Sequence, residues 1–288
     1  MIIDCHYHLD PRIQSLDNLL LKMDQYEIEK TALMPVMCDP IPHTRESLLK
    51  LMRFCLTHGP VRGLAKKIVA RFTLQGEVIL PKGPLKIYPD PDNQAVEKAL
   101  IAHPDRFLGW IFVNPRGKND PIDEFDKFKD IQGFIGIKAH PFWHQYPPQA
   151  LVPIARKACN AGMPLLIHAG FDGHGDFSPL LDQVTDLKLI LAHTGFPKFR
   201  ETWGLIKDRK NVWVDLSADA YVDTRITRKV VDFLGPDRCL FGTDGPYGTK
   251  ADDGVFDNGF IKQRLVKIFP DQGIQKRLLG DNFMEIIS

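Results

Sequence analysis

The chain opens with MIIDCHYH (residues 1–8), in which a short apolar run passes directly into a His-x-His pair. Side chains two residues apart on a strand point to the same side, so His6 and His8 can hold one cation between two imidazoles. Such pairs also occur by chance, but the position of this one directly after an apolar run favours a metal site. The same arrangement, an apolar run followed by a potential ligand, recurs along the chain and decides the predicted fold.

Eight short apolar runs alternate with longer amphipathic stretches. Each run is nearly continuous, as expected of parallel strands buried on both faces. Asp120 and Ser178, each followed by proline, are typical of helix N-caps, while Gly162 and Gly235 are typical of helix ends. This alternation favours an α/β fold closed as a (β/α)8 TIM barrel, with a doubly wound open sheet as the alternative. The runs cover residues 2–5, 31–36, 107–113, 133–139, 164–167, 187–192, 212–216 and 239–242.

One connection is much longer than the others. About seventy residues separate the second and third runs, far more than a usual βα loop. We expect an insertion at about residues 37–105, with a helix over 44–58, a second helix near Lys66 and a proline-rich hairpin over 76–91. The hairpin is either a lid beside the site or a flap without contact to substrate. A length of 288 residues suits a single barrel domain spanning 1–288.

Composition limits the class of partner. Lys plus Arg exceed Asp plus Glu by 37 − 36 = 1, and this balance gives no electrostatic reason to expect nucleic acid or an anionic membrane surface. No stretch approaches the roughly 20 apolar residues of a membrane-spanning helix. The five cysteines are scattered and contain no CxxC motif, which indicates free thiols in a reducing compartment. We therefore expect a cytoplasmic protein that acts on a small molecule.

Residues capable of binding metal follow most of the later runs. The carboxyl ends of barrel strands converge on one face, where barrel active sites lie. Each residue alone has an ordinary explanation, such as a core histidine, a turn aspartate or a lysine that reaches solvent. Their joint occurrence is harder to explain, because burying several such groups is costly unless they are paired or metal-bound. These residues are Lys138, His140, His168, His193, Asp215 and Asp244.

Five motifs together resemble the amidohydrolase superfamily, and within it the amidohydrolase-related branch that includes aminocarboxymuconate-semialdehyde decarboxylase. They occur in the order of that family and cover nearly the whole chain. The motifs are IDCHYH (3–8), GIKAHP (136–141), LIHAG (166–170), LAHTG (191–195) and FGTD (241–244).

The resemblance implies a barrel with one divalent metal ion, most often zinc. By match, His6, His8, His168 and Asp244 bind this ion. His193 positions or deprotonates the bound water, and Asp244 shares the role of base. Lys138 is compatible with the one-metal branch; in two-metal relatives the matching lysine is carboxylated, and His168 and His193 then bind the second ion. Without carboxylation, Lys138 can neutralise an aspartate or a substrate carboxylate. Dimers are common in the branch, so we expect a homodimer.

The ligand residues leave the reaction open. The main expectation is a hydrolase that directs zinc-activated water at a small, carboxylate-bearing amide, ester or lactone. The alternatives are a carboxy-lyase acting on an unsaturated or aromatic acid, and a metal-binding barrel without catalysis. Substrate contacts are expected after the fourth strand, at His140, Phe142, Trp143 and His144. Arg62, Arg71 and Arg116 are candidates to clamp a carboxylate, although ordinary surface charge is the favoured interpretation of each.

Overall fold

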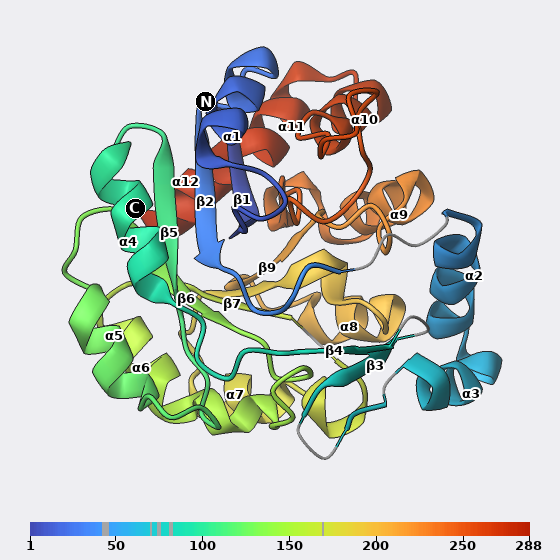
Figure 1. The fold of residues 1–288 in the computed structure, drawn as a ribbon. Helices are drawn as coiled ribbons and strands as arrows, with labels where there is room; N and C mark the ends of the chain where they lie inside the picture. Colours follow the sequence, from blue (N-terminus) through green and yellow to red (C-terminus); the bar gives the residue numbers. More distant parts are fainter. Residues whose placement is uncertain (42–45, 70, 74–75, 81–82, 169) are drawn as a thin grey trace.

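Eight parallel strands form a closed barrel (Figure 1). The computed structural model describes residues 1–41, 46–69, 71–73, 76–80, 83–168 and 170–288. The first and last strands are joined because the Cys5 amide donates to the Phe241 carbonyl at 3.0 Å. This closure confirms the predicted barrel and excludes the open sheet. In order around the barrel, the strands are β1 (Ile3–Leu9), β2 (Lys30–Pro35), β5 (Phe107–Phe112), β6 (Phe134–Ala139), β7 (Leu165–Ile167), β8 (Leu189–Leu191), β9 (Val212–Asp215) and β10 (Cys239–Leu240).

Helices cover the outside of the barrel. Asp120 accepts hydrogen bonds from the Ile122 and Asp123 amides, which confirms the predicted cap of α5. The prediction for Ser178 was wrong by one position, because Ser178 is the first residue of α7 and donates its amide to Asp176. The covering helices are α1 (Leu16–Gln25), α4 (Asn93–Ala102), α5 (Pro121–Phe128), α6 (Val152–Asn160), α7 (Ser178–Gln183), α8 (Phe199–Ile206), α9 (Thr224–Leu234), α10 (Phe260–Ile268), α11 (Gln272–Lys276) and α12 (Asn282–Ile287).

A bulge in β1 changes which side chains face the barrel interior. In the pairing with β2, Asp4 is opposite Thr31 and Tyr7 is opposite Leu33, so β1 carries one extra residue between these two points. Such a bulge interrupts the strict alternation of side chains. Cys5 therefore packs with the inner barrel cluster, which includes Trp110 and Leu240, while His6 and His8 line the pocket above. The predicted first run was too short, since both histidines lie inside the strand.

The long connection between β2 and β5 contains the predicted elements. Helix α2 covers Glu46–Thr57, helix α3 covers Gly59–Val69, and β3 (Val78–Leu80) pairs with β4 (Gly83–Leu85) as an antiparallel hairpin. The predicted start of the first helix, residues 44–45, lies outside the described residues. Helix α4 also falls within the predicted span of 37–105, but it packs on β2 and β5 as the ordinary crossover helix. The added segment therefore ends before α4.

Two arginines attach α2 and α3 to the rest of the barrel. The Arg53 guanidinium donates to the Asp219 carbonyl at 3.2 Å and pairs with the Asp223 carboxylate at 3.3 Å. Arg62 on α3 pairs with Glu201 on α8 at 3.0 Å. Figure 1 shows both helices beside α8 and α9.

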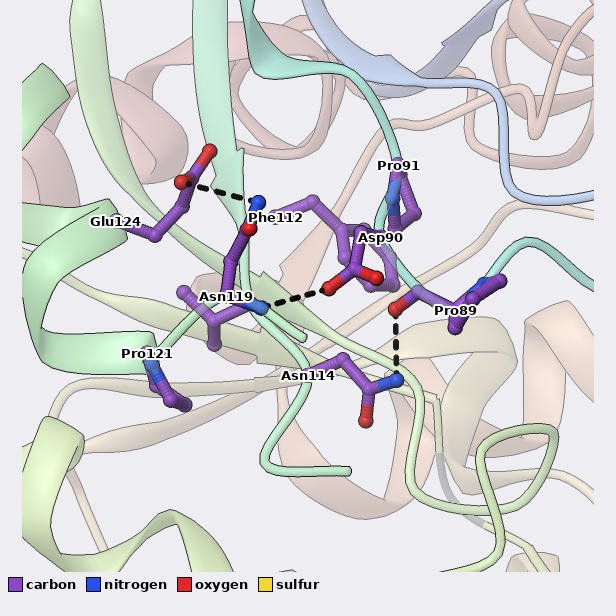
Figure 2. A pocket seen from close by; sticks show the side chains of 9 residues that line it. Pro89, Asp90, Pro91, Phe112, Asn114, Asn119, Pro121 and Glu124 are labelled. Carbon is purple, nitrogen blue, oxygen red and sulfur yellow. Dashed lines mark hydrogen bonds between the residues drawn. The ribbon is translucent and has the colours of Figure 1, made fainter. Parts of the chain in front are cut away.

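The returning chain is fixed where it rejoins the barrel, around a small depression (Figure 2). The Asn114 side chain donates to the Pro89 carbonyl at 2.8 Å, and the Asp90 carboxylate accepts from the Asn119 amide at 3.1 Å. These polar groups bond to one another, so the residues around the depression hold the segment before α4 against the loop before α5. No helix in the described part of the chain combines the length and apolar character needed to span a bilayer.

Candidate metal centre

Three potential ligand atoms converge at the mouth of the barrel. His6 Nε2 lies 3.2 Å and His8 Nε2 lies 3.4 Å from the same atom, Asp244 Oδ1. Atoms that bind zinc at 2.0–2.2 Å in a tetrahedron are about 3.4 Å apart. The spacing is therefore that of ligands arranged around one ion.

The backbone brings Asp244 to this position. Its φ of 63° lies in the left-handed region, which is rarely adopted by a residue other than glycine, and its amide donates to the His6 carbonyl at 2.8 Å. Conformations of this kind cost about 1–2 kcal/mol and persist where surrounding contacts hold them. The loop after β10 is thus tied to β1 beside the histidine pair.

The electrostatics of the mouth favour neutral imidazoles. Burial, assisted by the charge of Lys138, lowers the pKa of His8 to about 3 and that of His168 to about 3. Burial also holds the pKa of His6 well below its usual value. Burial raises the pKa of Asp244 well above its usual value, with the Lys138 charge opposing this. A buried carboxylate is stabilised by a cation beside it, and neutral imidazoles can bind that cation. Catalytic zinc sites use this combination of ligands, so the residues fit a metal ion.

His168 lies in the same pocket but not in the closest group. Its ring stacks on His140 at 4.2 Å and meets the ring of His193 edge-on at 4.6 Å between centroids. Among the described residues, one group close enough to share an ion is His6, His8 and Asp244, and the other is His6, His193 and Asp215. Of the four predicted ligands, His6, His8 and Asp244 therefore form one such group, and His168 belongs to neither group although it lines the same pocket.

His193 is held in a strained turn directly after β8. His193 and Thr194 have φ values of 52° and 56°, both left-handed. The His193 amide donates to Asp215 at 2.8 Å, and the Trp203 indole donates to the Thr194 carbonyl at 2.9 Å. This turn places His193 Nε2 3.9 Å from Asp244 Oδ1, beside the position an ion would take.

Lys138 is buried at the base of the pocket. Its Nζ lies 3.4 Å from His6 Nε2. Burial lowers the pKa of Lys138 to about 8. Among the described residues that line the pocket, it is the only lysine or arginine.

The outer wall of the pocket is mostly apolar and aromatic. His140 and Trp143, two of the residues proposed to contact substrate, line it with their rings stacked at 4.8 Å. His144 is directed elsewhere, because its Nε2 bonds to the Tyr88 carbonyl at 3.0 Å. Phe142 instead packs against Phe171. The remaining wall residues are Met37, Cys38, Ile41, Tyr221 and Tyr247.

The candidate arginine clamps lie outside the pocket. Arg62 pairs with Glu201, and Arg116 donates to the Gln145 carbonyl at 2.7 Å. Arg71 is exposed, and none of the three lines the pocket. Their positions agree with the favoured interpretation of these arginines as surface charge.

Sequence reasoning missed two groups of residues that shape the site. Asp215 was named as a residue capable of binding metal but not as a hydrogen-bond partner of the histidines, and Ser217 was not considered. The available signal for both residues was the Asp-x-Ser motif formed by Asp215 and Ser217 at the end of a buried apolar run. Tyr247 was also missed: its hydroxyl donates to Asp10 at 3.1 Å, and Asp10 is in turn held by Arg12 at 2.8 Å. That network fixes one wall of the pocket.

Together, the barrel and its mouth define an α/β barrel whose histidine- and aspartate-rich site lies at the carboxyl ends of the strands. A family model described as Amidohydrolase matches residues 3–283, so the chain belongs to the amidohydrolase family. No curated protein matches the chain.

Solved structures share the fold at low identity. A probable 2-pyrone-4,6-dicarboxylic acid hydrolase from Acinetobacter baumannii, with citric acid bound, is 14% identical with a TM-score of 0.60, over 99% of this chain and 98% of that chain. A 2,6-dihydroxybenzoate decarboxylase from Rhizobium is 14% identical with a TM-score of 0.60, over 99% and 98%. The IDCase of Metarhizium anisopliae is 13% identical with a TM-score of 0.61, over 100% and 97%. The neighbours thus include both a hydrolase and a decarboxylase on the same barrel.

Proposed function

We propose that the protein is a metal-dependent hydrolase that holds one zinc ion at His6, His8, His168 and Asp244 and acts on a small carboxylate-bearing amide, ester or lactone. The convergence of His6 Nε2 and His8 Nε2 on one oxygen of Asp244, at 3.2 and 3.4 Å, is the observation that carries the proposal. When bound, the ion supplies Lewis acidity toward water and a carbonyl group.

The other pocket residues then have distinct roles. His193 takes a proton from the attacking water at Nε2, since this atom faces Asp244. Asp244 shares that role while it holds the ion. Lys138, in its protonated form, orients a substrate carboxylate. Lys138 and His193 are only 1% and 2% exposed, so little bulk water reaches them.

A carboxy-lyase is the second candidate, because the walls of the pocket are aromatic. Trp143, Tyr221 and Tyr247 form flat surfaces around the polar base, which suits a planar unsaturated or aromatic acid. The same ligands serve both reactions, so substrate panels must separate them.

The test begins with metal analysis of the purified protein, followed by incubation with lactones, amides, esters and unsaturated or aromatic acids while CO₂ release is measured. Hydrolysis without CO₂ supports the main proposal, and CO₂ release supports the lyase. Asp244→Asn should lose the ion, whereas His193→Asn should keep it and lose turnover at least about a hundredfold, as for a removed general base. His103→Asn, at the end of α4, is the matched control and should change neither. A protein that binds no divalent ion would overturn the proposal.

A further inference from the structure

We propose that Asp215 and Ser217 select the tautomer of two pocket histidines, placing a hydrogen on Nδ1 of His6 and of His193 and leaving both Nε2 atoms bare. The use of those bare nitrogens rests on the proposed function. The tautomers themselves follow from the hydrogen bonds around one buried carboxylate.

The first step concerns Asp215 Oδ1, which must be an acceptor. The side chain is completely buried. Oδ1 lies 2.8 Å from the His193 amide and 3.1 Å from the Ser217 amide. A backbone N–H can only donate, so Oδ1 carries no hydrogen of its own.

The second step passes through Ser217 to His193. The Ser217 hydroxyl donates its single hydrogen to Asp215 Oδ1, because that oxygen can only accept. Ser217 Oγ therefore presents a lone pair to His193 Nδ1, which is 2.8 Å away. His193 must then supply the hydrogen of that bond from Nδ1, and its Nε2 is bare.

The third step concerns His6, which is constrained from both sides. His6 Nδ1 lies 2.7 Å from Asp215 Oδ2, and an ionised carboxylate can only accept from it. On the other side, Lys138 Nζ lies 3.4 Å from His6 Nε2, and an ammonium group can only donate. The contact with Asp215 is the shortest that the ring makes, so the single hydrogen of the neutral imidazole lies on Nδ1, and the lone pair on Nε2 faces Lys138 Nζ and Asp244 Oδ1, the latter at 3.2 Å.

One carboxylate, that of Asp215, therefore leaves a lone pair on the Nε2 atom of both His6 and His193, and both atoms lie near Asp244. The bare Nε2 atoms of His6 and His193 lie 3.2 and 3.9 Å from Asp244 Oδ1. Carboxylates that orient a metal-binding histidine typically contribute 10–100-fold to metal affinity or activity. Asp215 and Ser217 are thus positioning residues that act through the histidines.

The competing arrangement is a neutral Asp215 with its hydrogen on Oδ2. That hydrogen would be donated to His6 Nδ1, and His6 would carry its own hydrogen on Nε2, where it could not bind a metal. Two substitutions separate the branches of the network. In Asp215→Asn, the amide oxygen still accepts from the backbone and the amide nitrogen donates to His6, which imposes the opposite tautomer on His6. In Ser217→Ala, His193 loses its 2.8 Å partner, whereas His6, 3.4 Å from the same hydroxyl, keeps its shorter contact with Asp215 Oδ2.

The test is long-range ¹H–¹⁵N NMR of the metal-free protein labelled with ¹⁵N-histidine. We expect Nδ1–H forms for His6 and His193 in the unmodified chain. Asp215→Asn should move only His6 to the Nε2–H form, and Ser217→Ala should alter only His193. Asp10→Asn, another buried carboxylate at the barrel mouth, should alter neither.

Zinc competition with a chromophoric chelator gives a second readout. Asp215→Asn should weaken zinc binding about 10–100-fold, and Ser217→Ala should change it by less than about threefold. Nε2–H forms of His6 or His193 in the unmodified protein would overturn the inference, and this measurement needs no variant to fold. If His6 and His193 carry their hydrogens on Nδ1 but the protein shows no turnover, only the proposed function is refuted. If the protein shows turnover but these hydrogens lie on Nε2, only the present inference is refuted.

Discussion

Replacing Trp203 with phenylalanine should loosen the turn that carries His193 while leaving the barrel folded. The Trp203 indole is buried, and its N–H donates to the Thr194 carbonyl at 2.9 Å. A phenyl ring keeps most of the apolar contact but leaves that carbonyl unsatisfied, at a cost of about 1–3 kcal/mol. The left-handed conformations of His193 and Thr194 store roughly 2–4 kcal/mol between them. Loss of one restraint therefore makes a relaxed turn competitive with the strained one.

The expected result is a decrease of about 2 kcal/mol in the free energy of unfolding, with a larger effect on turnover than on zinc affinity. Urea denaturation followed by circular dichroism measures the first, and steady-state kinetics with chelator competition measures the second. Trp213→Phe on β9 is the matched control, because Trp213 is half-buried and packs against the inner barrel cluster. Equal turnover in the two variants would refute the idea that Trp203 holds the turn.

Substitutions at Asp4, at Arg53 on α2 and at Gly242 should each have a distinct effect. Burial raises the pKa of Asp4 to about 7, so the folded metal-free protein retains a proton that the unfolded chain releases near pH 4. Its stability should decline by roughly 4 kcal/mol as the pH rises from about 4 to about 7, and pH-dependent denaturation of Asp4→Asn should show a flatter profile. Arg53→Met should leave thermal stability nearly unchanged, since a partly exposed ion pair contributes at most about 1 kcal/mol. It should raise KM severalfold with kcat nearly unchanged, because Arg53 fixes the segment from which Met37, Cys38 and Ile41 reach the pocket. A fall in kcat alone would contradict this. An alanine Cβ at Gly242 would lie 3.0 Å from the His6 Cβ, so Gly242→Ala should weaken zinc binding at least about tenfold, whereas Gly173→Ala, with no atom within 4 Å, should not.

Much of the fold was predictable because strand and ligand signals coincide in the sequence. Each of the eight apolar runs corresponds to a strand. The pair His6 and His8 lies close to Asp244, which is far away in the sequence. This works because parallel strands leave their carboxyl ends on one face whatever the details of the helices.

The errors arose where local geometry departs from the regular pattern. Strict alternation would put Cys5 and His6 on opposite faces of the strand, but the bulge in β1 lets Cys5 pack in the inner cluster while His6 lines the pocket. His144 follows the fourth strand as predicted, but a single backbone acceptor, the Tyr88 carbonyl, directs it away from the pocket. Asp215 was named only as a possible metal-binding residue, because its hydrogen bonds join side chains and amides from three chain segments, which the sequence does not show to be neighbours.

The attachment of the added segment has a consequence for how this barrel can change. Among the described residues, the ion pairs that join it to α8 and to the loop after β9 come from Arg62 and Arg53, and Leu56 and Ala65 add apolar contacts to the core. The candidate metal ligands all belong to the barrel strands and the residues that directly follow them. Met37, Cys38 and Ile41 reach the pocket from the start of this segment. The cover and the chemistry are therefore separable parts, and exchanging the cover between relatives should redirect selectivity without rebuilding the reaction centre.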